Sequence, residues 1–148
     1  MFDELQELYQ QVILDHSKSP RNYRVLETAN RTAQGLNPLC GDSMTLYLLV
    51  EGDVIREITF QGAGCAISKA SASLLTESLK GRTQAEARRL FNLVHQMVTT
   101  GQVETDDLGK LAVFTGVHKF PARVKCAILP WRAALAALEG SEKTVSTE

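Results

Sequence analysis

The sequence predicts an α+β fold, in which a small set of antiparallel strands lies between helices. Two segments rich in Leu, Val, Ile, Tyr and Thr, 43–50 and 54–60, are joined by a Glu-Gly-Asp turn, a pattern typical of an antiparallel hairpin. Apolar residues recur at helical intervals on both sides of this hairpin, which indicates amphipathic helices. The length of 148 residues and the 44% hydrophobic share suit a single globular domain.

The chain before the hairpin is predicted to form one helix and one long loop. Residues 2–16 place apolar side chains on one helical face, so we expect a helix that ends near residue 16. Residues 17–38 are rich in Ser, Pro, Asn and Gly, and we interpret them mainly as an ordered loop. A short strand around Val25 or over 31–34 is the alternative, and it would add a third strand to the hairpin.

Two helices are expected directly after the hairpin. A glycine-rich turn leads into an apolar-periodic segment that should stop at Gly81. Thr83 and Glu86 have the spacing of a capping box, and the helix that they begin should run to about Thr99. The sheet therefore leads without a long connection into helical structure.

The C-terminal part of the chain is less regular. Residues 111–117 form a short apolar segment whose secondary structure the pattern does not assign. Pro121 and Pro130 interrupt the segment that follows and predict a kinked or broken helix pair. We expect one domain over residues 1–140 and a disordered polar tail over 141–148.

Charge and hydropathy exclude several classes of partner. Sixteen basic residues against seventeen acidic residues give a net charge of -1, so no overall field favours nucleic acid or an anionic membrane. The longest apolar run is 133–138, far shorter than the ~20 residues of a membrane-spanning helix. No export signal is recognised, and we expect a cytoplasmic protein. Its three widely spaced cysteines should then be thiols or metal ligands, because a disulfide framework would rarely use this odd set.

Two of the cysteines precede predicted elements. Cys40 and Asp42 flank Gly41 just before a strand, where side chains two residues apart point to one side and could face one ion. A buried cysteine beside a turn-capping Asp is an equally good interpretation of this segment. Cys65 follows a glycine-rich turn at the start of a helix, where unpaired amides and the helix dipole favour a thiolate.

The third cysteine lies in the C-terminal helical segment. Arg123 precedes Cys126 by three residues on much the same helix face, and its guanidinium could support a thiolate. The alternative is that Arg123 and Lys125 are solvated charges beside a core cysteine. Together with Asp42, the three cysteines form a sulfur and oxygen donor set that suits zinc or an iron–sulfur cluster, although no CxxC pair is present and scattered cysteines are often simply buried.

Three motifs carry a resemblance to a known family. NPLCGD at 37–42, GAGCAISKAS at 62–71 and FPARVKCAILPW at 120–131 resemble, in order and spacing, the SufU branch of the IscU/NifU N-terminal family, whose members act in iron–sulfur cluster assembly. The resemblance extends from about residue 3 to residue 139. It implies a small antiparallel sheet packed on one side by several helices, with a metal site at one end.

The resemblance also implies a site and an activity. It implies that the metal ligands are Cys40, Asp42, Cys65 and Cys126. Members of the SufU branch are described as zinc-containing sulfur acceptors for a PLP-dependent cysteine desulfurase of the SufS type. Zn(II) is therefore the expected cofactor, with an iron–sulfur cluster or iron as the alternative, and Cys40 is the expected persulfide acceptor because it should lie on a movable loop.

Two departures from the IscU pattern favour sulfur transfer. Lys125 stands where the IscU branch has a His before its last cysteine, and the chain reads KFPARVK where that branch has its chaperone-binding LPPVK stretch. The segment at about 82–105 resembles the insertion of the SufU branch. The chain is therefore expected to work as a sulfurtransferase-like acceptor beside a desulfurase, not as a stand-alone enzyme.

Two other functions remain open from the sequence. The same ligands could support a scaffold on which an iron–sulfur cluster is assembled and passed to apoproteins or other downstream assembly components. A binding module with a purely structural zinc is the alternative from another class. The histidines, His16, His95 and His118, are expected to be surface or structural residues, with His118 the one nearest in sequence to a candidate ligand.

Overall fold

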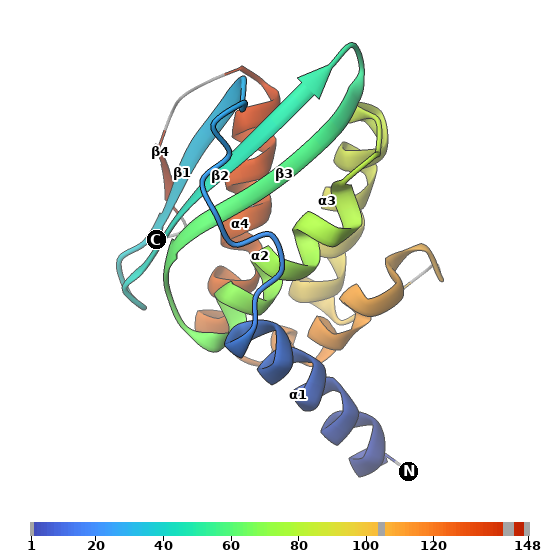
Figure 1. Cartoon of the computed structure of the whole chain (residues 1–148). Coiled ribbons are helices and arrows are strands. Elements are labelled where there is room, and N and C mark those ends of the chain that lie inside the picture. The colour runs from blue at the N-terminus through green and yellow to red at the C-terminus, as the bar shows by residue number, and fades with distance from the viewer. Residues whose placement is uncertain (1, 104–105, 141–143, 147–148) are drawn as a thin grey trace.

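A four-stranded sheet carries helices on one of its faces (Figure 1). The structure is a computed structural model, which describes residues 2–103, 106–140 and 144–146. The strands are β1 (Arg31–Asn37), β2 (Asp42–Glu51), β3 (Val54–Ala63) and β4 (Thr144–Ser146), in the spatial order β3-β2-β1-β4. The pairs β1–β2 and β2–β3 are antiparallel, and β4 runs parallel to β1.

The hairpin predicted from the sequence is the centre of this sheet. β2 alternates buried and partly exposed side chains along its length, as a strand with one face on the core requires. Met44, Leu46 and Leu48 point into the core and are fully buried. The α+β class with a small sheet covered on one side by helices is therefore confirmed.

The alternative of a strand over 31–34 that adds to the hairpin is confirmed, because β1 begins at Arg31 and continues to Asn37, and the main interpretation of this stretch as a loop was wrong. Its sequence, RTAQGLN, lacks the branched and aromatic residues that mark strands. Tertiary contacts stabilise it instead, because every residue of β1 pairs with β2. A Cβ at Gly35 would lie 3.0 Å from Leu129 Cδ1, so the glycine lets the C-terminal helix pack closely on this strand.

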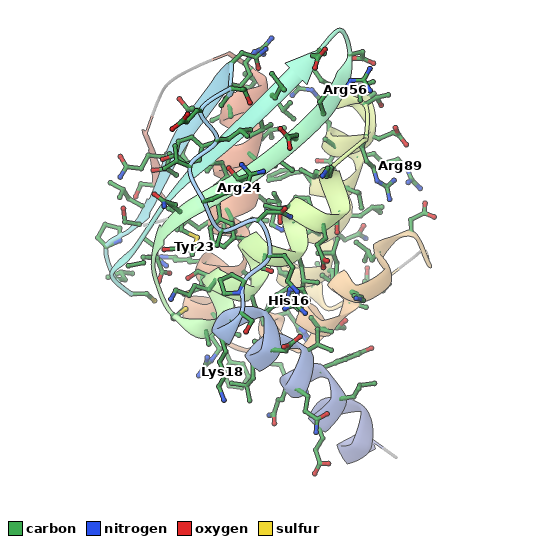
Figure 2. The ribbon with its side chains drawn as sticks, in the orientation of Figure 1. His16, Lys18, Tyr23, Arg24, Arg56 and Arg89 are labelled. Atoms are coloured by element: carbon green, nitrogen blue, oxygen red, sulfur yellow. The ribbon has the colours of Figure 1, made fainter. Side chains whose placement is uncertain are left out.

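The rest of the loop covers the far edge of the sheet. Phe60 of β3 exchanges backbone hydrogen bonds with Asn22 and Arg24, at 3.1 and 3.0 Å. The Tyr23 ring meets the Phe60 ring edge-on, with centroids 5.1 Å apart, and its hydroxyl bonds the backbone of Gly62. Figure 2 labels Tyr23 and Arg24 on this stretch of the loop, which pairs alongside β3 at Phe60.

The helices are α1 (Phe2–Lys18), α2 (Ala66–Leu79), α3 (Gln84–Thr100), the 3-10 segment η1 (Asp106–Lys119) and α4 (Pro121–Leu138). The first three lie close to their predicted places. The capping box at Thr83 and Glu86 is formed, and Gly101 ends α3 in the left-handed conformation with its N–H on the Met97 carbonyl. None of the helices in the described ranges is long and apolar enough to span a membrane.

In the C-terminal part, the structure assigns a segment that the sequence left open and corrects one prediction. The apolar segment 111–117 belongs to η1, which is interrupted at Gly109, where φ is 53°. α4 is one helix that continues through Pro130, where a kinked or broken pair was expected. Pro121 occupies its first turn, where no N–H is needed, and the hydroxyl of Ser71 donates to the Ala127 carbonyl one turn before Pro130.

The expected polar tail is partly ordered. Thr144–Ser146 form β4 against residues 34–36 of β1, although their composition gives no apolar face. Residues 141–143 and 147–148 of the predicted tail lie outside the described residues. The finding therefore replaces the expectation of disorder for the three strand residues.

Candidate metal centre

The β1–β2 turn presents a cysteine at one end of the sheet. The two strands pair up to Asn37 opposite Asp42, so the chain reverses over the four residues Pro38-Leu39-Cys40-Gly41. The Cys40 N–H donates to the Asn37 carbonyl at 3.2 Å, and Gly41 has a φ of +71°, which favours glycine. Cys40 is exposed at this turn, and the neighbouring Leu39 is 73% exposed.

Asp42, the first residue of β2, is buried at 2% exposure beneath this turn. Its Oδ1 accepts a hydrogen bond of 2.9 Å from the Cys65 N–H, and its Oδ2 lies 3.5 Å from the Asn37 amide nitrogen. A Cβ at Gly64 would lie 2.8 Å from Asp42 Oδ1. The glycine before Cys65 therefore lets the carboxylate reach the start of α2.

Cys65 is the N-cap residue of α2 and is partly buried. Its side chain makes no capping hydrogen bond. Its Sγ lies 3.7 Å from the Ser68 hydroxyl, which itself donates to the Cys65 carbonyl at 3.1 Å. The Cys65 thiol therefore does not cap the helix, while the backbone N–H of the same residue positions Asp42.

Cys126 approaches the same point from α4. It is 2% exposed, and its Sγ lies 3.3 Å from Cys40 Sγ and 3.6 Å from the Asn37 amide nitrogen. Burial raises the pKa of the Cys126 thiol, and its hydrogen bonds with Cys40, Cys65 and Asp42 raise this pKa further. A positive charge beside Cys126 would favour its thiolate form.

The geometry brings three of the four predicted ligands into one group. One ligand atom each from Cys40, Asp42 and Cys126 lies within 4.8 Å of the others. Cys65 adjoins this group through its amide on Asp42, but its sulfur is outside the 4.8 Å set.

This donor set fits a tetrahedral zinc ion. Zn–S bonds of about 2.3 Å and Zn–O bonds of about 2.1 Å place the ligand atoms of one tetrahedron about 3.5–3.8 Å apart. The two sulfurs of Cys40 and Cys126, 3.3 Å apart, are close to this spacing. A buried carboxylate and a buried thiol also lose solvation that a bound cation would replace.

Arg123, the residue expected to support the Cys126 thiolate, contacts an aromatic ring near the start of α4. It is exposed, and its guanidinium lies over the Phe120 ring, 6.0 Å from the centroid. Support of the Cys126 thiolate by Arg123 stays a prediction.

The histidines are occupied away from the sulfur atoms. His16 is buried against α2, with its Nδ1 2.7 Å from the Ser73 hydroxyl, and burial lowers its pKa. His118 Nδ1 lies 2.7 Å from the Thr115 carbonyl within η1. His95 stacks on Phe91 in α3.

Asn37 is the site residue that the sequence analysis did not select. It is fully buried and contacts Cys40 through its backbone and Asp42 and Cys126 through its side chain. The signal for it is the four-residue turn, which makes the residue before Pro38 the cross-strand partner of Asp42. That turn is recognised only once the preceding segment is assigned to a strand.

Comparisons with known proteins find relatives that match most of this chain. The sequence model of the NifU-like N-terminal domain matches residues 8–127. The zinc-dependent sulfurtransferase SufU of Bacillus subtilis is 41% identical over 130 residues, which are 87% of this chain and 88% of that protein. The iron–sulfur cluster assembly scaffold protein IscU of Thermotoga maritima is 38% identical over 135 residues, 89% of this chain and 93% of that protein.

Solved structures show the same fold. A putative iron–sulfur cluster assembly scaffold protein for the SUF system from Fervidobacterium islandicum superposes with a TM-score of 0.83 at 36% identity, covering 89% of this chain and 97% of that one. The N-terminal part of a NifU-like protein from Brucella abortus gives a TM-score of 0.82 at 21% identity, a likeness of fold alone.

Proposed function

Because this chain belongs to the family of the NifU-like N-terminal domain, we propose that it is an iron–sulfur cluster assembly protein that accepts sulfur as a persulfide from a PLP-dependent cysteine desulfurase. The observation that carries the proposal is the exposed thiol of Cys40 beside the buried Asp42 and Cys126. An exposed nucleophile on a turn can meet a partner protein, while the buried donors behind it stay within the fold.

The metal of this proposal is Zn(II). Cys40, Asp42 and Cys126 would hold it, with Cys65 as the fourth ligand by family resemblance. When bound, zinc keeps coordinating thiols deprotonated and protects them from oxidation. The name of the Bacillus subtilis relative supports zinc, whereas the IscU relatives support an iron–sulfur cluster as the alternative.

Cys40 is the proposed acceptor. Its thiolate would attack the outer sulfur of the persulfide on the desulfurase cysteine, so that a new S–S bond forms at Cys40, the S–S bond of the partner breaks, and the partner cysteine leaves as a thiolate. Cys126 is buried in α4 and Cys65 is fixed at the start of α2, so neither reaches out as Cys40 does. The sulfur would then pass to downstream assembly components or apoproteins.

The proposed setting is the reducing cytoplasm. The three cysteines are free thiols in the structure, and thiolate ligands require protection from oxidation. No basic surface excess or membrane-spanning helix among the described residues points to nucleic acid or a bilayer as a partner.

A scaffold function is the second candidate. The Thermotoga maritima relative is named as a scaffold, and the same thiols could hold a cluster. Lys125, where the IscU branch has a His, favours the sulfur acceptor instead.

The test begins with protein purified without added metal and without oxygen. Bound zinc, iron and acid-labile sulfide are measured first, and a cysteine desulfurase and cysteine are then added. The sulfur acceptor is supported by about one zinc per chain, stimulated sulfide release and a persulfide on Cys40 in the mass spectrum. Cys40→Ser should abolish this persulfide. Iron with labile sulfide and no stimulation would support the scaffold, and the proposal would then be wrong.

A further inference from the structure

Asn37 is the residue of this site to which the proposed function gives no role. It ends β1, directly opposite Asp42 in the strand register, and its side chain is 0% exposed. Its backbone carbonyl accepts the N–H of Cys40 at 3.2 Å and so closes the turn that carries the exposed thiol. Backbone and side chain together contact three candidate ligands.

The side-chain amide faces two of these ligands at once. Its nitrogen lies 3.5 Å from Asp42 Oδ2 and 3.6 Å from Cys126 Sγ. An amide nitrogen carries two hydrogens, so one can be directed at each acceptor. Because the Cys65 N–H already holds Asp42 Oδ1 at 2.9 Å, the Asn37 contact fixes the second oxygen of the same carboxylate.

The amide oxygen shows that this position is not optimised for stability. Asn37 Oδ1 is buried and has no hydrogen-bond partner among the described residues. An unpaired buried carbonyl lowers the free energy of unfolding, and a leucine of similar size would avoid that loss. The N–H groups directed at Asp42 and Cys126 explain why an amide is present.

We propose that Asn37 is a positioning residue, which holds the Asp42 carboxylate and the Cys126 sulfur at the metal and thereby slows metal loss. The inference rests on the proposed function, because it takes this cluster as the zinc site. Hydrogen bonds that orient metal ligands typically change metal affinity by about 10- to 100-fold. An N–H directed at a thiolate also lowers the energy of its sulfur lone pairs.

The test compares Asn37→Ala with a matched control, Asn30→Ala. Asn30 precedes the same strand at its other end and makes two hydrogen bonds with the backbone of Val50, at 2.7 and 2.9 Å. Three quantities are measured on each protein. They are the zinc affinity by competition with a chromophoric chelator, the melting temperature of the metal-free protein, and the sulfur-to-cobalt charge-transfer band after loading with Co(II).

We expect the Asn37 variant to change mainly zinc binding and the Asn30 variant to change mainly the melting temperature. Asn37→Ala should weaken zinc binding by about 10- to 100-fold and move the charge-transfer band to longer wavelength. Asn30→Ala should lower the melting temperature more than Asn37→Ala does, because it loses two well-formed hydrogen bonds, and should leave zinc affinity and spectrum unchanged. Asn37→Leu fills the space of the amide and gives the same zinc readout should the alanine variant not fold.

Two results would overturn the inference and are distinguishable from each other. Wild-type zinc affinity and an unshifted band in both the alanine and leucine variants of Asn37 would leave the proposed function intact and refute the positioning role alone. A wild-type protein that binds no zinc and accepts no persulfide would refute the proposed function, and the inference with it.

Discussion

Gly64 is the residue that allows the sheet and α2 to share a carboxylate. A Cβ at this position would lie 2.8 Å from Asp42 Oδ1 and still closer to the Ser68 hydroxyl. Its φ is not in the left-handed region, so any penalty on substitution comes from crowding and not from backbone strain. A glycine needed only for a left-handed turn would instead be penalised on substitution through its backbone conformation.

Gly64→Ala should therefore lower both stability and zinc affinity. We expect a loss of about 1–3 kcal/mol in the free energy of unfolding, because the methyl group overpacks the contact with Asp42. Gly116→Ala is the control, since a Cβ there would meet no atom within 4 Å. Chemical denaturation and zinc competition check the pair. Equal effects of the two substitutions would contradict the crowding argument.

Asp42→Ala should change metal exchange more than it changes the fold. The variant loses the hard oxygen of the donor set, while the Cys40 and Cys126 sulfurs remain. Asp53→Ala, at an exposed hairpin turn, is the matched control. Zinc release to a chelator, followed by absorbance, should be at least about 10-fold faster in the first variant and unchanged in the second. Equal release rates would remove Asp42 from the ligand set.

The residues of the candidate site were predictable to different degrees. The spacing of Cys40 and Asp42 places both near one ion, and the motifs link them to Cys65 and Cys126. Asn37 could not be predicted, because its role depends on strand register and on the approach of α4. Local spacing shows which ligands neighbour one another along the chain, but not which side chains support them from elsewhere in the fold.

At the scale of elements, the start of α3 is fixed by a reciprocal cap. Glu86 N–H donates to Thr83 Oγ1, and Glu86 Oε1 accepts from the Thr83 N–H. These contacts lower the pKa of Glu86, with the Thr83 backbone hydrogen bond as the largest cause. The cap is therefore complete when Glu86 is ionised.

The cap should make stability depend on pH in the acidic range. Because the pKa of Glu86 is lower in the folded state, its contribution is present above the unfolded pKa of about 4.3 and is lost as the pH falls through the folded value. Glu86→Gln should flatten this part of the stability profile, and Thr83→Ala should cost about 1 kcal/mol at neutral pH. Thermal unfolding from pH 3 to 7, on the order of one scan per half unit, checks both. An unchanged profile in the glutamine variant would argue against the cap.

The packing of α1 on α2 should also depend on pH, in a range closer to neutrality. Burial lowers the pKa of His16, which lies 2.7 Å from the Ser73 hydroxyl and 3.8 Å from Glu77. A histidine that is harder to protonate when folded stabilises the fold above its unfolded pKa of about 6.5, and this contribution falls as the pH drops below that value. His16→Gln should remove the dependence between about pH 5 and 7. The measurement is the protection of α1 amides against hydrogen exchange, relative to the unfolded chain, at about pH 5 and about pH 7. Equal protection at the two pH values in the wild-type protein would contradict this account.

Elements with strong local signals were predictable, and those held by tertiary contacts were not. The capping box and the Glu-Gly-Asp turn are local, and both structures formed where the sequence predicts them. A strand over 31–34 was expected only as the alternative to a loop, and β1 depends on its pairing with β2 and on close packing against α4. α4 passes through Pro130 because it is buried among other elements, which the proline pattern alone does not show.

At the scale of the molecule, one core joins the sheet to the helices. Side chains from β2, β3, α2, α3, η1 and α4 belong to a single buried cluster, in which Trp131, Phe60 and Phe114 are the largest fully buried members. A chain of this length buries enough apolar surface to fold without a metal. Of the candidate metal centre, Cys126 belongs to this cluster, whereas Cys40 is exposed outside it.

Chelation should therefore leave the protein folded. We expect the metal-free protein to keep its far-ultraviolet circular dichroism and a cooperative thermal transition, with a lower melting temperature that zinc restores in proportion to its concentration. The comparison is zinc-loaded protein in the same buffer. Unfolding on chelation would favour the alternative of a purely structural zinc.

Other segments of the chain pair with part of β3 and with part of β1. On one side Phe60 of β3 bonds the backbone of Asn22 and Arg24, and on the other β1 pairs with Thr144–Ser146. Unpaired outer strands are templates for intermolecular pairing and amyloid-like association. Because residues 34–36 of β1 and Phe60 of β3 already pair within the chain, these stretches offer no free edge at which a neighbouring molecule could add a strand and start an aggregate.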